Sequence, residues 1–243
     1  MKQRIWAAKF MDGTISVKAD IAVSYPDLLD ARREYELLRK YANSTATDDE
    51  KIEFNHITDE YFKTFHDVFR YKEKIPEKYA PVSCYLTGAL TRNNLAKNLK
   101  RSIFRGVHAD YICNEASANA LLSVRLGESQ LFKMNVFDKK NTVIEGFYLY
   151  RFHPFEQRRF VVEQSLIDIG LTKKNLPSKY ALFYKNIKTN DIVLTSDALN
   201  CTVDIWQDPI VESMLFLTDT LKEKLEEAGV AKTWKLIECK IQA

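Results

Sequence analysis

The chain has 243 residues, of which 46% are hydrophobic and 28% charged, with only seven glycines and six prolines. This composition is typical of a folded globular protein and excludes a low-complexity or largely disordered chain. The 36 basic and 33 acidic residues leave a net charge of +3, which is too weak to indicate a nucleic-acid partner.

The sequence contains no segment that predicts a membrane partner. Residues 1–10 lack the apolar core of a signal peptide, and no apolar run approaches the roughly 18 residues of a membrane span. We therefore expect a cytoplasmic protein. The cysteines at positions 84, 113, 201 and 239 are far apart and form no C-x-x-C pair. We expect all of them to be reduced and buried.

The first predicted element is a hairpin. Residues 4–10 and 14–18 have the alternation of strands, and Asp12-Gly13 between them is a turn dipeptide, since glycine tolerates a positive φ.

A pair of helices is predicted over residues 20–75, after this hairpin. Pro26 opens the first helix, and the capping box from Thr47 to Glu50 opens the second, which belongs to a section that ends at Pro76. The residues of the second helix expected to face inward are Ile52, His56 or Ile57, Tyr61, Phe62, Phe65, Val68 and Phe69.

Two stretches have the same strand–helix–strand pattern. In the first, residues 82–86 form a strand, Thr87 caps a helix that continues through Ile103 to Gly106, and residues 107–113 form the second strand. In the second, residues 213–217 form a strand, residues 218–228 form a helix that stops at Gly229, and residues 234–239 form the last strand.

The region between these units is predicted to be rich in strands. Residues 131–137 and 143–150 flank a polar turn, which is typical of a long hairpin. Shorter strands are expected at 160–162, 180–184 and 192–194, and residues 203–206 precede Pro209 and the closing unit.

This order of elements predicts an α+β fold with a mixed, mainly antiparallel sheet and helices packed on it. The chain is expected to form a single domain (1–243) or two lobes, a helix-rich one at 1–128 and a β-rich one at 129–243.

No motif for catalysis, metal binding or cofactor binding emerges. Glu53, His56 and Glu60 share one helical face, but a metal site needs ligands from a second element. The sequence has no G-x-S-x-G motif and no phosphate-binding glycine loop. We therefore expect no catalytic residue, no metal and no cofactor.

A protein-binding site is the more specific hypothesis. The segment Asp204, Trp206, Asp208 and Glu212 combines acids with an aromatic residue before a proline turn, and tryptophan is enriched at interface hot spots. Tyr148 and Arg151 lie in a second aromatic stretch of this kind. The competing interpretation is that Trp206 packs in the core and that the acids are ordinary loop residues.

The closing unit carries a family resemblance. Residues 217–229, Leu-Thr-Asp-Thr-Leu-Lys-Glu-Lys-Leu-Glu-Glu-Ala-Gly, followed by a final strand, resemble the C-terminal signature of bacterial polymorphic-toxin immunity proteins. The similar group is a large α+β immunity family formerly catalogued as a domain of unknown function. The resemblance covers mainly residues 210–240 and extends to 82–150, whereas residues 20–75 have no counterpart in it.

This resemblance implies a non-catalytic protein that binds a cognate toxin C-terminal domain and blocks its active site or substrate entry. The slight positive charge departs from many inhibitors of basic nucleases, which are acidic, although a local acidic patch could serve the same purpose. Two alternatives stay open. One is an enzyme, for example a hydrolase built around His153, and the other is an adaptor that uses the helices at 26–71.

Overall fold

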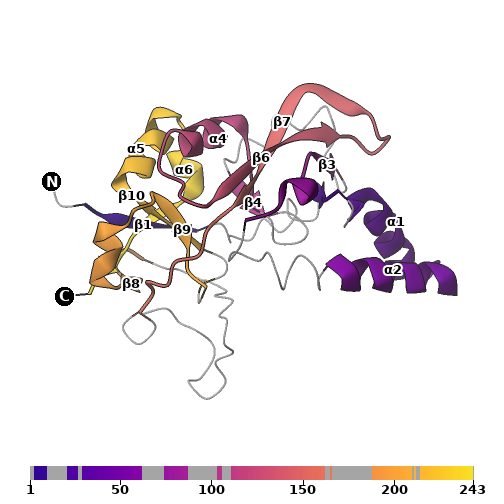
Figure 1. Cartoon of the computed structure of the whole chain (residues 1–243), viewed down its shortest axis with the longest axis horizontal. Coiled ribbons are helices and arrows are strands. Elements are labelled where there is room, and N and C mark those ends of the chain that lie inside the picture. The colour runs from indigo at the N-terminus through magenta and orange to yellow at the C-terminus, as the bar shows by residue number, and fades with distance from the viewer. Residues whose placement is uncertain are drawn as a thin grey trace, which may run out of the picture.

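The computed structural model describes residues 3–9, 21–26, 29–61, 74–86, 103–105, 111–161, 165, 188–209, 211 and 214–242. These residues form the predicted α+β fold, with mainly antiparallel sheets and helices packed on them (Figure 1). The predicted strands at 14–18 and 180–184 lie outside the described residues.

A four-stranded antiparallel sheet joins the two ends of the described chain. Its strands, in spatial order, are β11 (Leu236–Glu238), β1 (Ile5–Lys9), β10 (Met214–Thr218) and β9 (Ile205–Gln207). Ala7 of β1 lies opposite Phe216 on one side and Ile237 on the other. The first strand is therefore an inner strand of a sheet whose other members come from the last 40 described residues.

Both faces of β10 are buried. Met214 and Phe216 face one core cluster, and Leu215 and Leu217 face another. A strand that is buried on both faces does not alternate between apolar and polar residues. This explains the continuous apolar run from which the strand was predicted.

A second sheet has six strands. In spatial order these are β2 (Ile21–Ser24), β3 (Ser83–Leu86), β6 (Gln130–Phe137), β7 (Val143–His153), β5 (Tyr111–Cys113) and β4 (Ile103–Arg105). The β3–β6 pair is parallel, and the other pairs are antiparallel. Because β3 pairs with β6 and β1 with β10, both sheets draw strands from both sides of residue 128, so strand pairing does not follow the predicted lobe boundary.

The predicted long hairpin is confirmed in β6 and β7. The Asp138 carboxylate accepts hydrogen bonds from the amides of Lys140 (2.8 Å) and Thr142 (2.9 Å), and Asn141 adopts a positive φ of 64°. Aspartate and asparagine favour such a turn because their short polar side chains bond the local backbone.

Five described helices complete the fold. They are α1 (Ala31–Ala42), α2 (Asp48–Tyr61), α4 (Glu115–Leu122), α5 (Asp219–Glu227) and α6 (Ala231–Trp234). Short 3₁₀ turns lie at Glu77–Tyr79 and Ser196–Asn200, and β8 (Val193–Leu194) pairs in parallel with β12 (Lys240–Ile241). No described helix is long and apolar enough to cross a membrane.

Helices α4, α5 and α6 cover a core shared by the two sheets (Figure 1). This core contains Trp234, which is fully buried and donates a 3.4 Å hydrogen bond to the Ser117 hydroxyl of α4. The closing strand–helix–strand unit is confirmed as β10, α5 and β11, with α6 added before the last strand.

Two predicted helix boundaries need correction. The first helix begins at Ala31 rather than Pro26, because Tyr25 and Leu29 exchange two backbone hydrogen bonds and Asp30 provides the N-cap. Ile103 lies in β4 and not in a helix, since it pairs with Cys113 of β5. Residues 87–102, where that helix was predicted, lie outside the described residues.

Candidate protein-binding surface

Asp204 is buried, and its hydrogen bonds connect segments that are distant in the sequence. Its carboxylate accepts three hydrogen bonds of 3.0 to 3.1 Å from the Arg125 amide and guanidinium, and one of 2.8 Å from the Thr218 hydroxyl. Burial by itself would raise the pKa of this carboxyl, but these hydrogen bonds outweigh burial and hold the pKa below its ordinary value. Thr218 thus bonds Asp204 instead of capping α5 with its hydroxyl.

Trp206 and Asp208 are also part of the scaffold. Trp206 is fully buried and stacks on Phe216 with ring centroids 5.8 Å apart. The Asp208 carboxylate accepts hydrogen bonds from the backbone amides of Arg159 (2.6 Å) and Phe160 (2.7 Å). The prediction that Asp204, Trp206 and Asp208 contact a partner is therefore wrong, because all three side chains are buried. Glu212 lies outside the described residues.

The second predicted stretch divides in two. Arg151 is buried, with its guanidinium bonded to the Tyr25 hydroxyl (3.2 Å) and to the Phe152 carbonyl, so its predicted partner contact is also corrected. Tyr148 is half-buried on β7, and the Lys133 ammonium lies 3.7 Å from the centroid of its ring. A partner contact through Tyr148 stays a prediction.

The cysteines are free and buried, as predicted. Burial raises the pKa of all four thiols, most strongly at Cys84, Cys113 and Cys239. Thiols in such surroundings are poor nucleophiles. Within the described part of the chain, no three His, Cys, Asp or Glu side chains gather in a way that could hold a metal ion. His153 is itself buried.

An exposed surface with a different character lies on the helical hairpin of α1 and α2, which projects from one end of the molecule (Figure 1). The hairpin is held together by polar contacts. Arg33 donates two hydrogen bonds to Glu53, at 2.7 and 2.5 Å, and Lys40 pairs with Glu50. The Tyr41 and Phe54 rings add an apolar contact, with centroids 5.9 Å apart.

The start of α2 is fixed by the predicted capping box. The Thr47 hydroxyl accepts from the Glu50 amide (3.2 Å), and the Glu50 carboxylate accepts from the Thr47 amide (3.0 Å). Glu50 therefore has two functions, since it closes the cap and also binds Lys40 of α1. This arrangement determines which face of α2 turns toward α1 and which turns toward solvent.

The outward face of α2 has an apolar centre. Ile52 is 67% exposed, although the sequence pattern placed it inward, while Ile57 packs against the core as predicted. Helical spacing surrounds Ile52 with exposed polar residues three and four positions away. These are Asp48, Asp49, Asn55 and His56.

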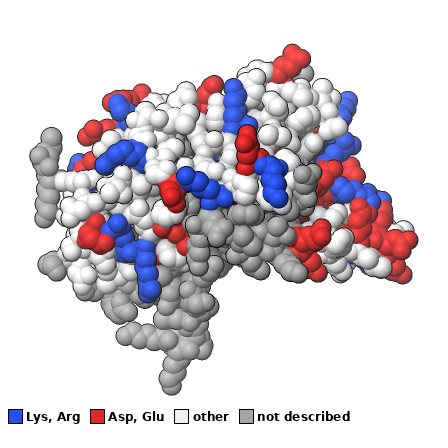
Figure 2. Space-filling model, in the orientation of Figure 1, with Lys and Arg blue, Asp and Glu red and all other residues white. Residues whose placement is uncertain are grey.

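The rest of this face is acidic. Lys51 neutralises Asp48 at 2.7 Å and lowers the pKa of that carboxyl through a hydrogen bond. Asp49, Asp59 and Glu60 have no lysine or arginine partner among the described residues. In Figure 2, acidic side chains gather over the projecting end. We call this surface, with Ile52 at its centre, the α2 face.

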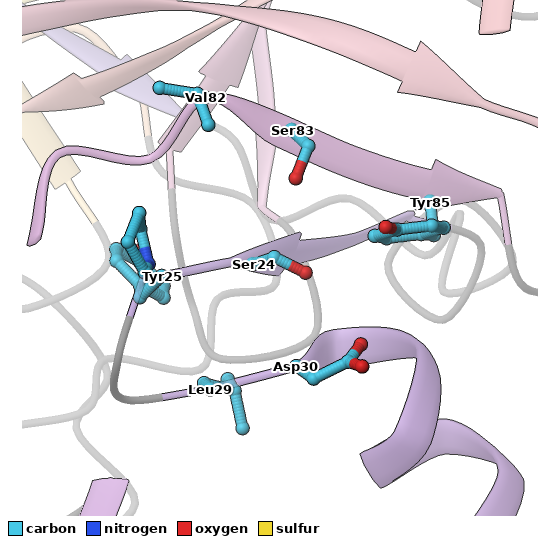
Figure 3. A pocket seen from close by; sticks show the side chains of 8 residues that line it. Ser24, Tyr25, Leu29, Asp30, Val82, Ser83 and Tyr85 are labelled. Carbon is cyan, nitrogen blue, oxygen red and sulfur yellow. The ribbon is translucent and has the colours of Figure 1, made fainter.

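Two hollows open elsewhere on the described surface. One of about 380 Å³ lies where β2 and β3 meet the start of α1 (Figure 3). The other, of about 570 Å³, is lined by residues of β1, α5, α6 and β11, together with Gly229 and Lys235. Its aromatic residue is Trp6, with the Arg4 and Lys222 cations 5.1 and 5.0 Å from the ring centroid. The second hollow is basic, in contrast to the acidic α2 face.

No protein-family model matches the chain, and no curated protein matches it. The candidate surface therefore rests on its own geometry. Sequence pattern missed Ile52 because its spacing also fits an inward position. The signal that could have identified it is the pair of aspartates one turn before it, in a helix that carries six acidic residues and one lysine.

Proposed function

We propose that this protein is an immunity protein that binds a cognate bacterial toxin domain and blocks its active site or substrate entry. The α2 face carries the proposal, because it combines an exposed isoleucine with exposed acids on a projecting hairpin, and three of these acids have no lysine or arginine partner among the described residues. Interface energy concentrates in a few apolar anchors, and surrounding charge sets the association rate and the choice of partner. The proposed toxin surface is accordingly basic around an apolar recess.

Two further features support this proposal. The closing unit that resembles the immunity family has the expected strand–helix–strand elements, and the residues that resemble the family signature lie in the buried sheet and its helix. The scaffold and the α2 face are thus separate parts of the chain. Such a division suits an inhibitor, since the fold can stay constant while the contact surface changes with the toxin.

The test is protection of bacteria that express the product of the gene adjacent to this one, combined with binding of the two purified proteins. Wild-type protein is expected to bind and to protect. Ile52→Asp should weaken binding at least tenfold and abolish protection, because it places a charge at the centre of the interface.

Leu122→Asp is the matched control. Leu122 is also an exposed apolar helix residue, at 61%, but it lies on α4. This variant should protect as well as wild type does. Wild-type protein that neither binds nor protects would overturn the proposed function, and equal effects of the two variants would overturn the assignment to the α2 face.

A further inference from the structure

The smaller hollow, at the start of α1, has the chemistry of a cation site. Its lining comes from β2, from the turn that leads into α1, and from the approach to β3 and β3 itself. Figure 3 shows the oxygens of Ser24, Ser83 and Asp30 directed toward one space, beside the ring of Tyr85. Among the lining residues, Asp30 is the one with a formal charge, so the hollow favours a positively charged ligand.

The two carboxylate oxygens of Asp30 differ in their contacts with the described residues. Its Oδ1 accepts hydrogen bonds from the amides of Arg32 (3.0 Å) and Arg33 (3.3 Å) and so caps α1. Its Oδ2 accepts no hydrogen bond from the described residues. Ser24 contributes as well, since its Oγ accepts one hydrogen bond from the Ala31 amide (3.1 Å) and a hydroxyl oxygen can accept a second from a cation.

Tyr85 forms the aromatic wall. Its half-exposed ring stacks on Phe137 with centroids 5.1 Å apart, which fixes its orientation. Burial raises the pKa of Tyr85, and the negative charge of Asp30 raises it further. The Asp30 carboxylate therefore lies close enough to Tyr85 to disfavour ionisation of its hydroxyl. The nearby Arg32 guanidinium is bonded to Glu36 at 3.2 Å.

We propose that this hollow holds an arginine or lysine side chain of the protein that binds the α2 face. The proposal rests on the proposed function for the identity of that partner. A guanidinium or ammonium group can lie against the Tyr85 ring, as cations do on aromatic faces, and donate to Asp30 Oδ2 and to the serine hydroxyls. A charge-assisted hydrogen bond to a carboxylate is among the stronger polar contacts available to a protein.

The hollow belongs to the same helical hairpin as the α2 face. Asp30 caps α1, and α1 is bound to α2 through Arg33 and Lys40. A surface rich in lysine and arginine, which the charge of the α2 face already favours, supplies the side chain. The expected partner surface is therefore more specific: it is basic and carries one protruding arginine or lysine beside its apolar recess.

The test uses small probes with the full-length protein. N-acetyl-arginine methylamide and its lysine counterpart are titrated while the backbone amide resonances of Asp30, Ser83 and Tyr85 are followed by NMR. Both cationic probes are expected to give saturable shifts, and the neutral citrulline counterpart none. Equal binding of the citrulline probe, or no binding of either cationic probe, would overturn the proposal.

Asp30→Asn is the decisive variant, because asparagine caps a helix as well as aspartate does but carries no charge. It should lower the affinity for both cationic probes by roughly tenfold, as expected for the loss of a hydrogen bond to a charged group, while the helix content stays unchanged. Ile52→Asp should leave probe binding unchanged. Since no toxin takes part, failure here would leave the proposed immunity function standing, and failed protection would leave the probe result standing.

Discussion

The segment from Asp204 to Asp208 and the α2 face look alike in sequence and differ completely in the fold. Each combines carboxylates with one large apolar side chain. In the first, Asp204 and Asp208 are buried and bonded to Arg125 and to backbone amides, around a Trp206 that is fully covered. In the α2 face, Asp49 and Asp59 are in solvent around an Ile52 that is 67% exposed.

The difference teaches that charge beside an apolar residue does not identify a binding surface. A carboxylate can enter the interior when enough donors meet it, and it then fixes the chain in place. A carboxylate without such donors stays exposed to water, and an apolar side chain on the same helical face is then exposed as well. The number of donors around each carboxylate therefore separates scaffold from surface, and the following variants measure that separation.

The largest expected effect is that of Trp206→Ala. Removing a fully buried indole that stacks on Phe216 leaves a cavity and should cost about 4 kcal/mol of unfolding free energy. Urea unfolding followed by circular dichroism measures this loss. Trp206→Phe keeps an aromatic ring at this position and should lose less than half as much unfolding free energy as Trp206→Ala. A loss below about 1 kcal/mol would show that the side chain is solvated.

Asp204→Asn should rank next, at about 2 kcal/mol, because it removes the charge of a buried carboxylate and turns an amide donor toward the Thr218 hydroxyl and the Arg125 guanidinium, whose side chain is 60% exposed. Asp59→Asn on α2 is the matched change and should alter stability by less than about 0.5 kcal/mol. The same urea experiment compares the two variants. Equal costs would remove the distinction between the buried and the solvated carboxylate.

Lowering the pH should reduce the difference in unfolding free energy between the wild type and Asp204→Asn. The pKa of Asp204 is lower in the folded state than in the unfolded chain, where an aspartate titrates near 3.9. Its contribution is thus complete well above that value and is lost as the pH falls through the folded pKa. Urea unfolding of both proteins at pH 7 and at decreasing pH should show this narrowing. A gap that widened in acid would contradict the sign of the shift.

Thr47→Ala should have a smaller effect, about 1 kcal/mol, because it removes the hydroxyl that caps α2. Hydrogen exchange of the Glu50 amide is the local measurement, and it should become faster. Thr47→Ser keeps the hydroxyl and should exchange as wild type does. Unchanged exchange in the alanine variant would mean that packing on α1, rather than the cap, holds the start of α2.

The smallest expected effect on stability is that of Ile52→Ala, below about 0.5 kcal/mol, because the side chain is already in solvent. The same substitution should weaken partner binding at least tenfold if Ile52 is the anchor of the interface. Scanning calorimetry of the free protein measures the change in stability, and titration calorimetry with the partner measures the change in binding affinity. A large stability loss with unchanged binding would reverse the contrast with Trp206.

The fold was largely predictable because its signals are local. The capping box at Thr47, the polar turn after β6 and the apolar run of β10 each specify their element within a few residues. The start of α1 was not, since Asp30 caps it only because Tyr25 and Leu29 first close a tight turn. The strand at Ile103 depends on its pairing with Cys113, and no local pattern shows such a partner.

The candidate site was predicted less well for a related reason. Whether Asp204 is exposed depends on Arg125, 79 residues away in the chain. Whether Ile52 is exposed depends on Glu53 and Glu50, the residues of α2 that bind α1. Burial is a property of the assembled contacts, and a single sequence supplies the residue types without the distances between them.

The position of β1 also has a consequence for synthesis. Ile5 leaves the ribosome before β10 and β11 are made, but its strand pairs with β10 opposite Thr218 and with β11 at residues 236–238. The four-stranded sheet therefore cannot close until nearly the whole described chain has been made, and contacts between such distant residues form slowly. During that interval β1 is an unpaired apolar strand. Nascent chains halted before β10 should thus be the species most prone to aggregate and most dependent on chaperones.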